Sequence, residues 1–165
     1  TDSSNGTSDN DDGLSDNDDD EGNDDDDNDI EIPAELQALV DAYLATNFEG
    51  YTLKDGDLDT LCNGTPAVEA VLVDVDGNEL HAYFALDLNI TLLQTETEIT
   101  AQDLPTTLTD ALAANYAAYT LETEAYRIEL ADGTVQYEVE LKNTTTNAEI
   151  TLILTADGTL VCEEE

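Results

Sequence analysis

The sequence predicts an α+β protein in which an acidic N-terminal arm precedes two repeats, each one helix packed on an antiparallel sheet of about four strands. Three observations predict this fold class. Residues 1–31 carry 15 of the chain's 41 acidic side chains and no Lys or Arg. A set of apolar residues at helical spacing occurs twice in the remainder of the chain. Each set is followed by segments of alternating polarity that are separated by Gly-containing turns.

In the arm, residues 1–31, the first 29 residues have essentially one apolar side chain, Leu14. Burial therefore cannot offset the roughly 1–2 kcal/mol per residue that is lost when a backbone becomes ordered. We expect the arm to need cations, a partner or both before it adopts a fixed structure. The alternative is a plain disordered acidic linker.

Each repeat is predicted to open with a helix that starts at a proline, a residue favoured in the first helical turn. The first helix starts at Pro33 and ends before the Tyr-Thr-Leu of 51–53, and the second starts at Pro105 and ends before the Tyr-Thr-Leu of 119–121. The first is four residues longer, which is about one helical turn and keeps the apolar face in phase. This correspondence indicates an internal duplication, with repeats at 32–102 and 103–165.

The strands follow each helix. In the first repeat they are predicted at 52–62, 68–75, 80–87 and 90–99, and in the second at 125–131, 134–141, 149–155 and 159–163. Asp-Gly pairs at 76–77, 132–133 and 157–158 supply turns between consecutive strands.

Two segments of the second repeat carry a resemblance to a known family. Residues 137–141 read Tyr-Glu-Val-Glu-Leu, and residues 155–160 read Thr-Ala-Asp-Gly-Thr-Leu. Together with the short proline-led helix they resemble the PepSY-like family, whose β-lactamase-inhibitor-like members often occur in tandem. The first repeat departs from the pattern, with 82–86 as its nearest equivalent. The resemblance implies a secreted, periplasmic or surface-exposed binding module and carries over no catalytic residue.

The charge of the chain excludes several partners. Outside the arm, 26 acidic residues stand against Lys54, Arg127 and Lys142. Nucleic acid is excluded as a direct partner, because phosphate contacts need clustered basic side chains. No apolar run approaches the roughly 20 residues of a membrane-spanning helix, and no signal peptide is visible, so no membrane insertion is expected. Such an acidic body also resembles proteins from high-salt environments, which is compatible with any of the functions considered below.

The sequence predicts that the protein is not an enzyme. Every Ser lies in the arm, so a Ser-His-Asp hydrolase has no nucleophile in the folded part. The single histidine, His81, is expected to be an ordinary strand residue, and nothing in the spacing favours a pair with Cys62. No phosphate-binding loop, CxxC or HExxH sequence occurs.

Calcium is the one cofactor that the residue types favour, because it selects six to eight hard oxygen ligands. Residues 8–19 fit the EF-hand loop imperfectly, with Ser at position 1, Gly13 at position 6, Asp at position 12 and no flanking helices. A poorer frame at 17–28 shares Asp19 with it. The candidate ligands in the arm are Asn10, Asp12, Leu14, Asp16 and Asp19.

A second candidate calcium site lies in the first predicted strand. Asp55, Asp57 and Asp59 alternate along it, which places three carboxylates on one face at intervals of about 6–7 Å. A bound cation would relieve their mutual repulsion. The alternative is a solvated outer face.

Cys62 and Cys162 are the only cysteines, and each stands at the end of a predicted strand, one in each repeat. A disulfide between them would contribute about 4–5 kcal/mol in the chain-entropy model and would fit an extracellular location. The alternative is two buried free thiols.

Four Asn-x-Ser/Thr sequons are candidate glycosylation sites, at Asn5, Asn63, Asn89 and Asn143. A chain rich in Asn and Thr produces several by chance. Asn63 and Asn143 lie in predicted turns, where a glycan is easily accommodated.

Two functions remain. The first is an extracellular or cell-surface structural protein that assembles with copies of itself into a filament or matrix, bridged by Ca²⁺ through the arm. The second is a secreted or periplasmic module that binds or inhibits a partner protein, with the arm as a tether. The sequence favours the first, because it gives the arm a role.

Overall fold

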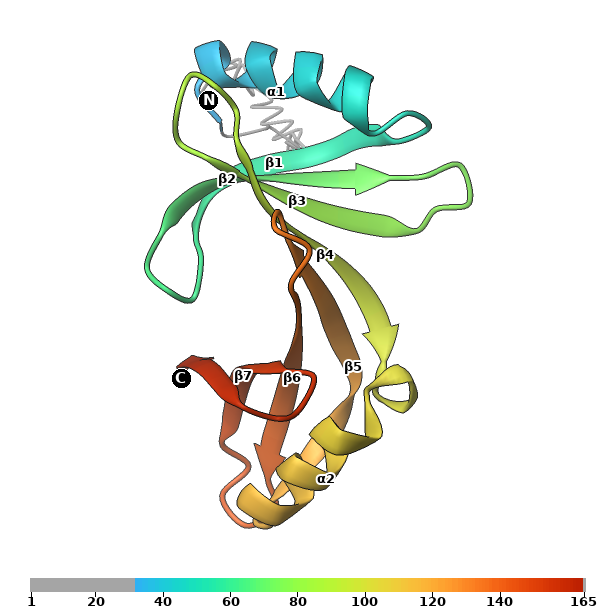
Figure 1. The fold of residues 1–165 in the computed structure, drawn as a ribbon, viewed down its shortest axis with the longest axis vertical. Helices are drawn as coiled ribbons and strands as arrows, with labels where there is room; N and C mark the ends of the chain where they lie inside the picture. The colour runs from blue at the N-terminus through green and yellow to red at the C-terminus, as the bar shows by residue number, and fades with distance from the viewer. Residues whose placement is uncertain (1–31, 165) are drawn as a thin grey trace, which may run out of the picture.

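The computed structural model describes residues 32–164, which form two α-helices, one short 3-10 helix and one eight-stranded antiparallel sheet (Figure 1). In chain order the elements are α1 (Ala34–Asn47), β1 (Thr52–Thr60), β2 (Pro66–Val73), β3 (Glu79–Ala85), β4 (Leu92–Thr100), η1 (Ala101–Asp103), α2 (Thr106–Asn115), β5 (Tyr119–Leu130), β6 (Val135–Asn143), β7 (Glu149–Thr155) and β8 (Leu160–Glu164).

The two α-helices begin where the sequence predicts them, directly after Pro33 and Pro105. Each ends at an aromatic residue whose amide N–H donates back into the last turn: Phe48 to the carbonyl of Leu44 at 2.9 Å, and Tyr116 to that of Leu112 at 2.8 Å. Within residues 32–164, neither helix combines the length and the apolar character that crossing a membrane requires.

The eight strands form a single sheet in sequence order, each strand antiparallel to the next. The predicted fold class, two repeats that each place a helix on a sheet of about four strands, is therefore wrong. β4 pairs with β5 along a ladder that runs from Gln94 opposite Leu130 to Thr100 opposite Glu124. In two separate sheets these strands would be edges with unpaired N–H and C=O groups, and pairing with each other satisfies those groups. The predicted domain boundaries stay a prediction.

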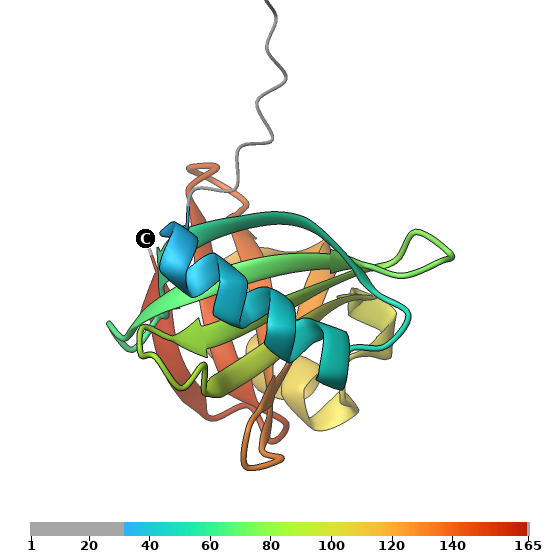
Figure 2. The same cartoon turned by 90° about the horizontal axis from the view of Figure 1, so that it is seen from above.

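Both helices cover the same face of this sheet, each over its own apolar core (Figures 1 and 2). The register shows why. Thr97 of β4 lies opposite Leu80, which packs against the core under α1, and Ile99, two residues further along β4, packs against the core under α2. Because residues two apart in a strand point to the same side, α1 and α2 lie on one face, and no helix of residues 32–164 covers the other.

The helix-free face is concave. β1 and β8 are the two edges of the sheet, and seven steps of roughly 4.8 Å would separate them by about 34 Å in a flat sheet. Instead Cys62, just after β1, and Cys162 in β8 form a disulfide with their Cα atoms 6.3 Å apart. The sheet therefore curls until its ends meet, with the helices outside and the bare face inside (Figure 1).

Candidate functional site

Five polar side chains from three adjacent strands form a cluster on the concave face. Glu69 of β2, Tyr83 of β3 and Gln94 of β4 are direct cross-strand partners in one row. His81 of β3 and Glu96 of β4 are partners in the neighbouring row. Strand alternation separates Glu69, His81 and Tyr83 from the core residues of β2 and β3, which point to the other side and pack under α1. We call these five residues the polar cluster.

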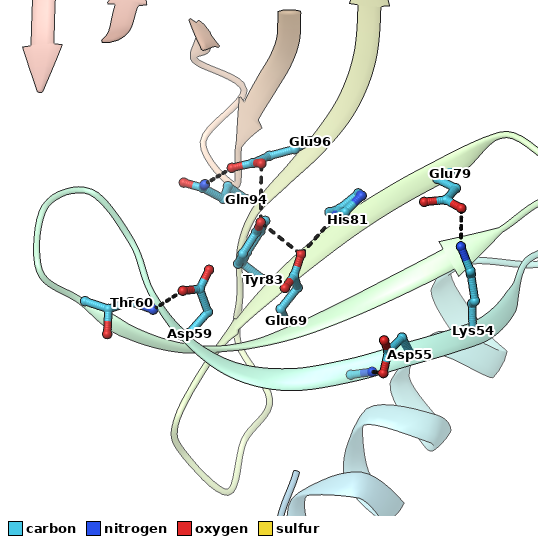
Figure 3. Close-up of polar contacts among 11 residues, drawn as sticks. Lys54, Asp55, Asp59, Thr60, Glu69, Glu79, His81, Tyr83, Gln94 and Glu96 are labelled. Atoms are coloured by element: carbon cyan, nitrogen blue, oxygen red, sulfur yellow. Dashed lines mark hydrogen bonds and ion pairs between the residues drawn. The ribbon is translucent and has the colours of Figure 1, made fainter. Parts of the chain in front are cut away.

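The polar cluster is joined by hydrogen bonds from end to end (Figure 3). Oε1 of Glu69 accepts from Nδ1 of His81 at 2.6 Å and from the Tyr83 hydroxyl at 3.1 Å. The same hydroxyl lies 3.3 Å from Oε2 of Glu96, whose Oε1 accepts from Nε2 of Gln94 at 2.7 Å. Tyr83 thus stands between two carboxylates.

Burial and neighbouring charges shift the pKa values of four side chains in the polar cluster. Glu96 is only 9% exposed, and burial raises its pKa although Gln94 and Tyr83 donate to it. The hydrogen bond from His81 lowers the pKa of Glu69, and the same bond raises the pKa of His81. Burial, followed by the charges of Glu96 and Glu69, raises the pKa of Tyr83. The hydrogen bond between Glu69 and His81 therefore favours an ion pair, whereas burial makes ionisation of Glu96 more costly than that of an exposed glutamate.

A cavity of about 290 Å³ opens above the polar cluster. Its wall also includes Asp59 from the end of β1, Tyr126 from β5 and Ile153 from β7, so both halves of the sheet contribute. Cys62 lines the same cavity, so the disulfide lies on its rim. The half-buried ring of Tyr126 meets that of His81 edge to face, with 6.3 Å between the ring centroids.

The buried carboxyl of Glu96 gives a testable pH dependence. Because its pKa is raised in the folded state, the folded state holds this proton more tightly, and the resulting stability is lost as pH rises through the folded-state pKa. Gln keeps a carbonyl acceptor for Gln94 and carries no charge. We expect the free energy of unfolding of Glu96→Gln to rise relative to wild type as the pH increases from about 4.3, the ordinary pKa of a glutamate, through the higher folded-state pKa of Glu96.

Urea unfolding at several pH values measures this difference. Glu98→Gln is the control, since it removes one charge from an exposed position of the same strand. A difference between Glu96→Gln and wild type that stays constant, or falls with rising pH, would show that Glu96 is not destabilised as an anion.

The three Asp residues proposed as a calcium site lie along β1, an edge of the sheet. Each of Asp55, Asp57 and Asp59 accepts a hydrogen bond from the amide N–H of the next residue, at 2.8, 2.6 and 2.6 Å. Within residues 32–164, no three His, Cys, Asp or Glu side chains are grouped so that they could hold a metal ion. These carboxylates accept hydrogen bonds from amide N–H groups of an edge strand and place negative charge along it. Both effects disfavour pairing of another strand with this edge. Calcium binding here stays a prediction.

The other site residues predicted for the arm fall outside the described residues. This applies to the calcium ligands Asn10, Asp12, Leu14, Asp16 and Asp19 and to the sequon at Asn5.

Of the other three sequons, two lie in loops and the third, at Asn143, begins at the last residue of β6 rather than in the predicted turn. Asn63 is exposed in the β1–β2 loop, next to the disulfide, and its side chain accepts from the Thr65 amide at 2.9 Å. Asn89 is exposed in the β3–β4 loop, and Asn143 ends β6 and is half-buried. Glycosylation at each stays a prediction.

The sequence does not predict the polar cluster as a site. His81 was expected to be an ordinary strand residue, and Glu69, Tyr83, Gln94 and Glu96 were not singled out. A signal was available, because Glu69 is the one charge in the apolar strand β2 and the other four alternate in β3 and β4. Alternation alone puts each pair on one face of its own strand, but only the register shows that the faces coincide.

No protein-family model and no curated protein matches the sequence. Solved structures do resemble it. A DUF2874 family protein from Bacteroides uniformis has a TM-score of 0.55 and 15% identity over 81% of this chain and 88% of its own. A candidate periplasmic protein from Bacteroides eggerthii has a TM-score of 0.55 and 12% identity, over 80% of this chain and 87% of its own. A BLIP-like protein from Bacteroides fragilis has a TM-score of 0.51 and 21% identity, over 78% of this chain and 84% of its own.

These similarities concern the fold, because the sequence identities are low. They are consistent with the β-lactamase-inhibitor-like side of the resemblance that the sequence suggested, whereas a tandem of PepSY-like units is not confirmed. The chain thus has the fold of the DUF2874 and BLIP-like structures.

Proposed function

We propose that this chain is an exported, non-enzymatic module that binds a partner protein in the concave face of its sheet. The observation that carries the proposal is the polar cluster, with its cavity, on a curled face that neither α1 nor α2 covers (Figure 1). A preformed concave surface with a few converging polar groups is typical of a binding site.

Two observations support export. The disulfide between Cys62 and Cys162 is of the kind that persists in oxidising compartments. Among the proteins with a similar fold, one is described as a candidate periplasmic protein and another as BLIP-like. A binding module outside the cytoplasm is therefore the function that we favour for this chain.

The absence of catalysis is part of the proposal and rests on the residue types. The arm holds every Ser of the chain. Cys62 lines the same cavity as His81, and in the disulfide it has no thiolate to offer as a nucleophile.

The binding module is preferred to the calcium-bridged filament for a structural reason. A filament built by strand addition needs an open sheet edge, and three amides of the edge strand β1 already donate to Asp carboxylates. The calcium-binding arm remains a separate prediction for residues 1–31.

Affinity capture from the exported proteins of the source organism tests the proposal. The baits are the full chain, Tyr126→Ala on the concave face and Tyr51→Ala, an exposed tyrosine at the start of β1 that packs against Phe48 beside α1. We expect wild type and Tyr51→Ala to retain one defined protein at constant stoichiometry. Because buried interface tyrosines are frequent hot spots, Tyr126→Ala should bind it about tenfold more weakly or worse.

Two results would contradict the proposal. One is that no protein is retained by the wild-type bait. The other is that Tyr126→Ala retains the same protein with unchanged affinity while its circular dichroism matches that of wild type.

A further inference from the structure

The cavity on the concave face has the size of a subsite for a single side chain. At about 290 Å³ it lies just below the range that is usual for drug-sized ligands. The Glu69 and Glu96 carboxylates and the rings of Tyr83 and Tyr126 line it. A group that enters here meets negative charge and aromatic surface together.

The charge lining the cavity is strongly unbalanced. The carboxylates of Asp59, Glu69 and Glu96 line it beside one potential cation, His81. Burial raises the pKa of Glu96, and the hydrogen bond from His81 lowers the pKa of Glu69. His81 therefore compensates chiefly the charge of Glu69. A cation supplied from outside would offset the cost of keeping these carboxylates ionised in a partly enclosed site.

The chain's own basic side chains are engaged elsewhere. Lys54 pairs with Glu79, Arg127 with Glu129 at 2.8 Å, and Lys142 with Glu149. These three are all the Lys and Arg residues of the sequence, and none lines the cavity. Within residues 32–164 no Lys or Arg therefore supplies a compensating cation to the cavity, and a ligand can supply one.

The polar cluster contains carboxylate oxygens that can accept further hydrogen bonds. The hydroxyl of Tyr83 has one proton and lies within 3.3 Å of both Glu69 and Glu96, so it can donate to only one of them at a time. Both hydrogen bonds to Glu69 end on Oε1, which leaves Oε2 without a further hydrogen bond from residues 32–164. The carboxylates of Glu69 on β2 and of Glu96 on β4, which lie on either side of β3, therefore retain acceptors for additional donors.

A guanidinium group matches this arrangement better than an ammonium group. It presents five N–H donors in one plane, which suits bridging two carboxylates. Its flat face also stacks on aromatic rings, and Tyr126 supplies a ring at the wall of the cavity.

We propose that this cavity is a subsite for an arginine side chain, which the partner protein inserts between Glu69, Glu96 and Tyr126. The inference rests on the proposed function and names the chemistry by which the partner is recognised. Charge complementarity and the unused acceptors of the polar cluster are the observations that carry it.

The test uses the intact full chain and a pair of small probes. Nα-acetyl-arginine amide carries the guanidinium, and Nα-acetyl-citrulline amide replaces it with a neutral urea of nearly the same shape. At constant ionic strength, we expect the arginine probe to shift the side-chain NMR signals of His81, Tyr83 and Tyr126 in a saturable manner. Its affinity should be in the millimolar range that suits a single weak fragment, and the citrulline probe should bind at least tenfold more weakly.

Variants locate the binding. Glu69→Gln with Glu96→Gln removes the two central charges and should weaken the arginine probe at least tenfold. Asp76→Asn removes one charge from the exposed β2–β3 turn and should leave the affinity unchanged. The wild-type comparison of the two probes needs no variant, so a double variant that fails to fold does not decide the result.

Equal binding of both probes, or no saturable shift with arginine, would overturn the inference. Unchanged affinity in a folded double variant would do the same. None of these results touches the proposed function itself, because capture of a partner by the concave face is measured separately and without the probes.

Discussion

Removing the disulfide by Cys62→Ser with Cys162→Ser is expected to lower the free energy of unfolding by about 4–5 kcal/mol. The sequence separation of the two cysteines is 100, so the cross-link removes a large amount of conformational freedom from the unfolded chain. In the folded protein it also holds the β1–β2 loop against β8, where the edges of the sheet meet. A loss of this size is comparable to the whole stability of many domains.

Urea unfolding followed by circular dichroism measures the change, and wild type kept under reducing agent is the second sample. Both should unfold at clearly lower urea than oxidised wild type. A thiol assay on unreduced protein that found two free sulfhydryls, or a double variant with an unchanged midpoint, would show that the bridge does not stabilise the fold.

Gly158→Ala is expected to be the most damaging single substitution among the turn glycines, at about 2–5 kcal/mol. Gly158 has a φ of +82°, which disfavours any residue with a Cβ, and it touches α2. A Cβ added there would lie 2.3 Å from the Cβ of Ala111. The hydroxyl of Thr107 also donates to the Ala156 carbonyl at 2.6 Å, so the β7–β8 turn is fixed against the helix.

The β5–β6 turn offers a matched control. Gly133 has nearly the same φ, +84°, also follows an Asp, and has nothing within 4 Å of an added Cβ. Gly133→Ala should therefore cost only the backbone strain, about 1–2 kcal/mol. Adding Ala111→Gly to Gly158→Ala should recover part of the loss, since it removes the contacting atom. Equal unfolding midpoints for the two glycine variants would contradict the close packing of this turn on α2.

The sequence was sufficient for the elements but not for their assembly. The helix starts follow from Pro33 and Pro105, and the Asp-Gly turns from local chemistry. The union of two half-sheets could not be read in the same way, because no turn connects β4 to β5 directly. Residues 101–118, which include η1 and α2, lie between them, and alternation fixes which face a residue occupies but not which strand lies beside it.

For the same reason, the polar cluster could not be predicted from the sequence. The contact between Glu69 and Tyr83 depends on the register of β2 against β3, and that between Tyr83 and Glu96 on the register of β3 against β4, which includes an irregularity after Tyr83. The curl that brings Tyr126 to the same cavity arises from the joined sheet as a whole. By contrast, the partnership of Cys62 with Cys162 needed only a count of cysteines and their places at strand ends.

Hydroxyl-radical footprinting of the full chain, with and without the captured partner, tests the central claim most directly. Tyr126 on the concave face and Tyr51 beside α1 are reporters of the same chemistry on different surfaces. If the concave face holds the partner, the oxidation rate of Tyr126 falls severalfold on complex formation while that of Tyr51 is unchanged. Protection of Tyr51 with no change at Tyr126 would place the partner elsewhere and contradict the account.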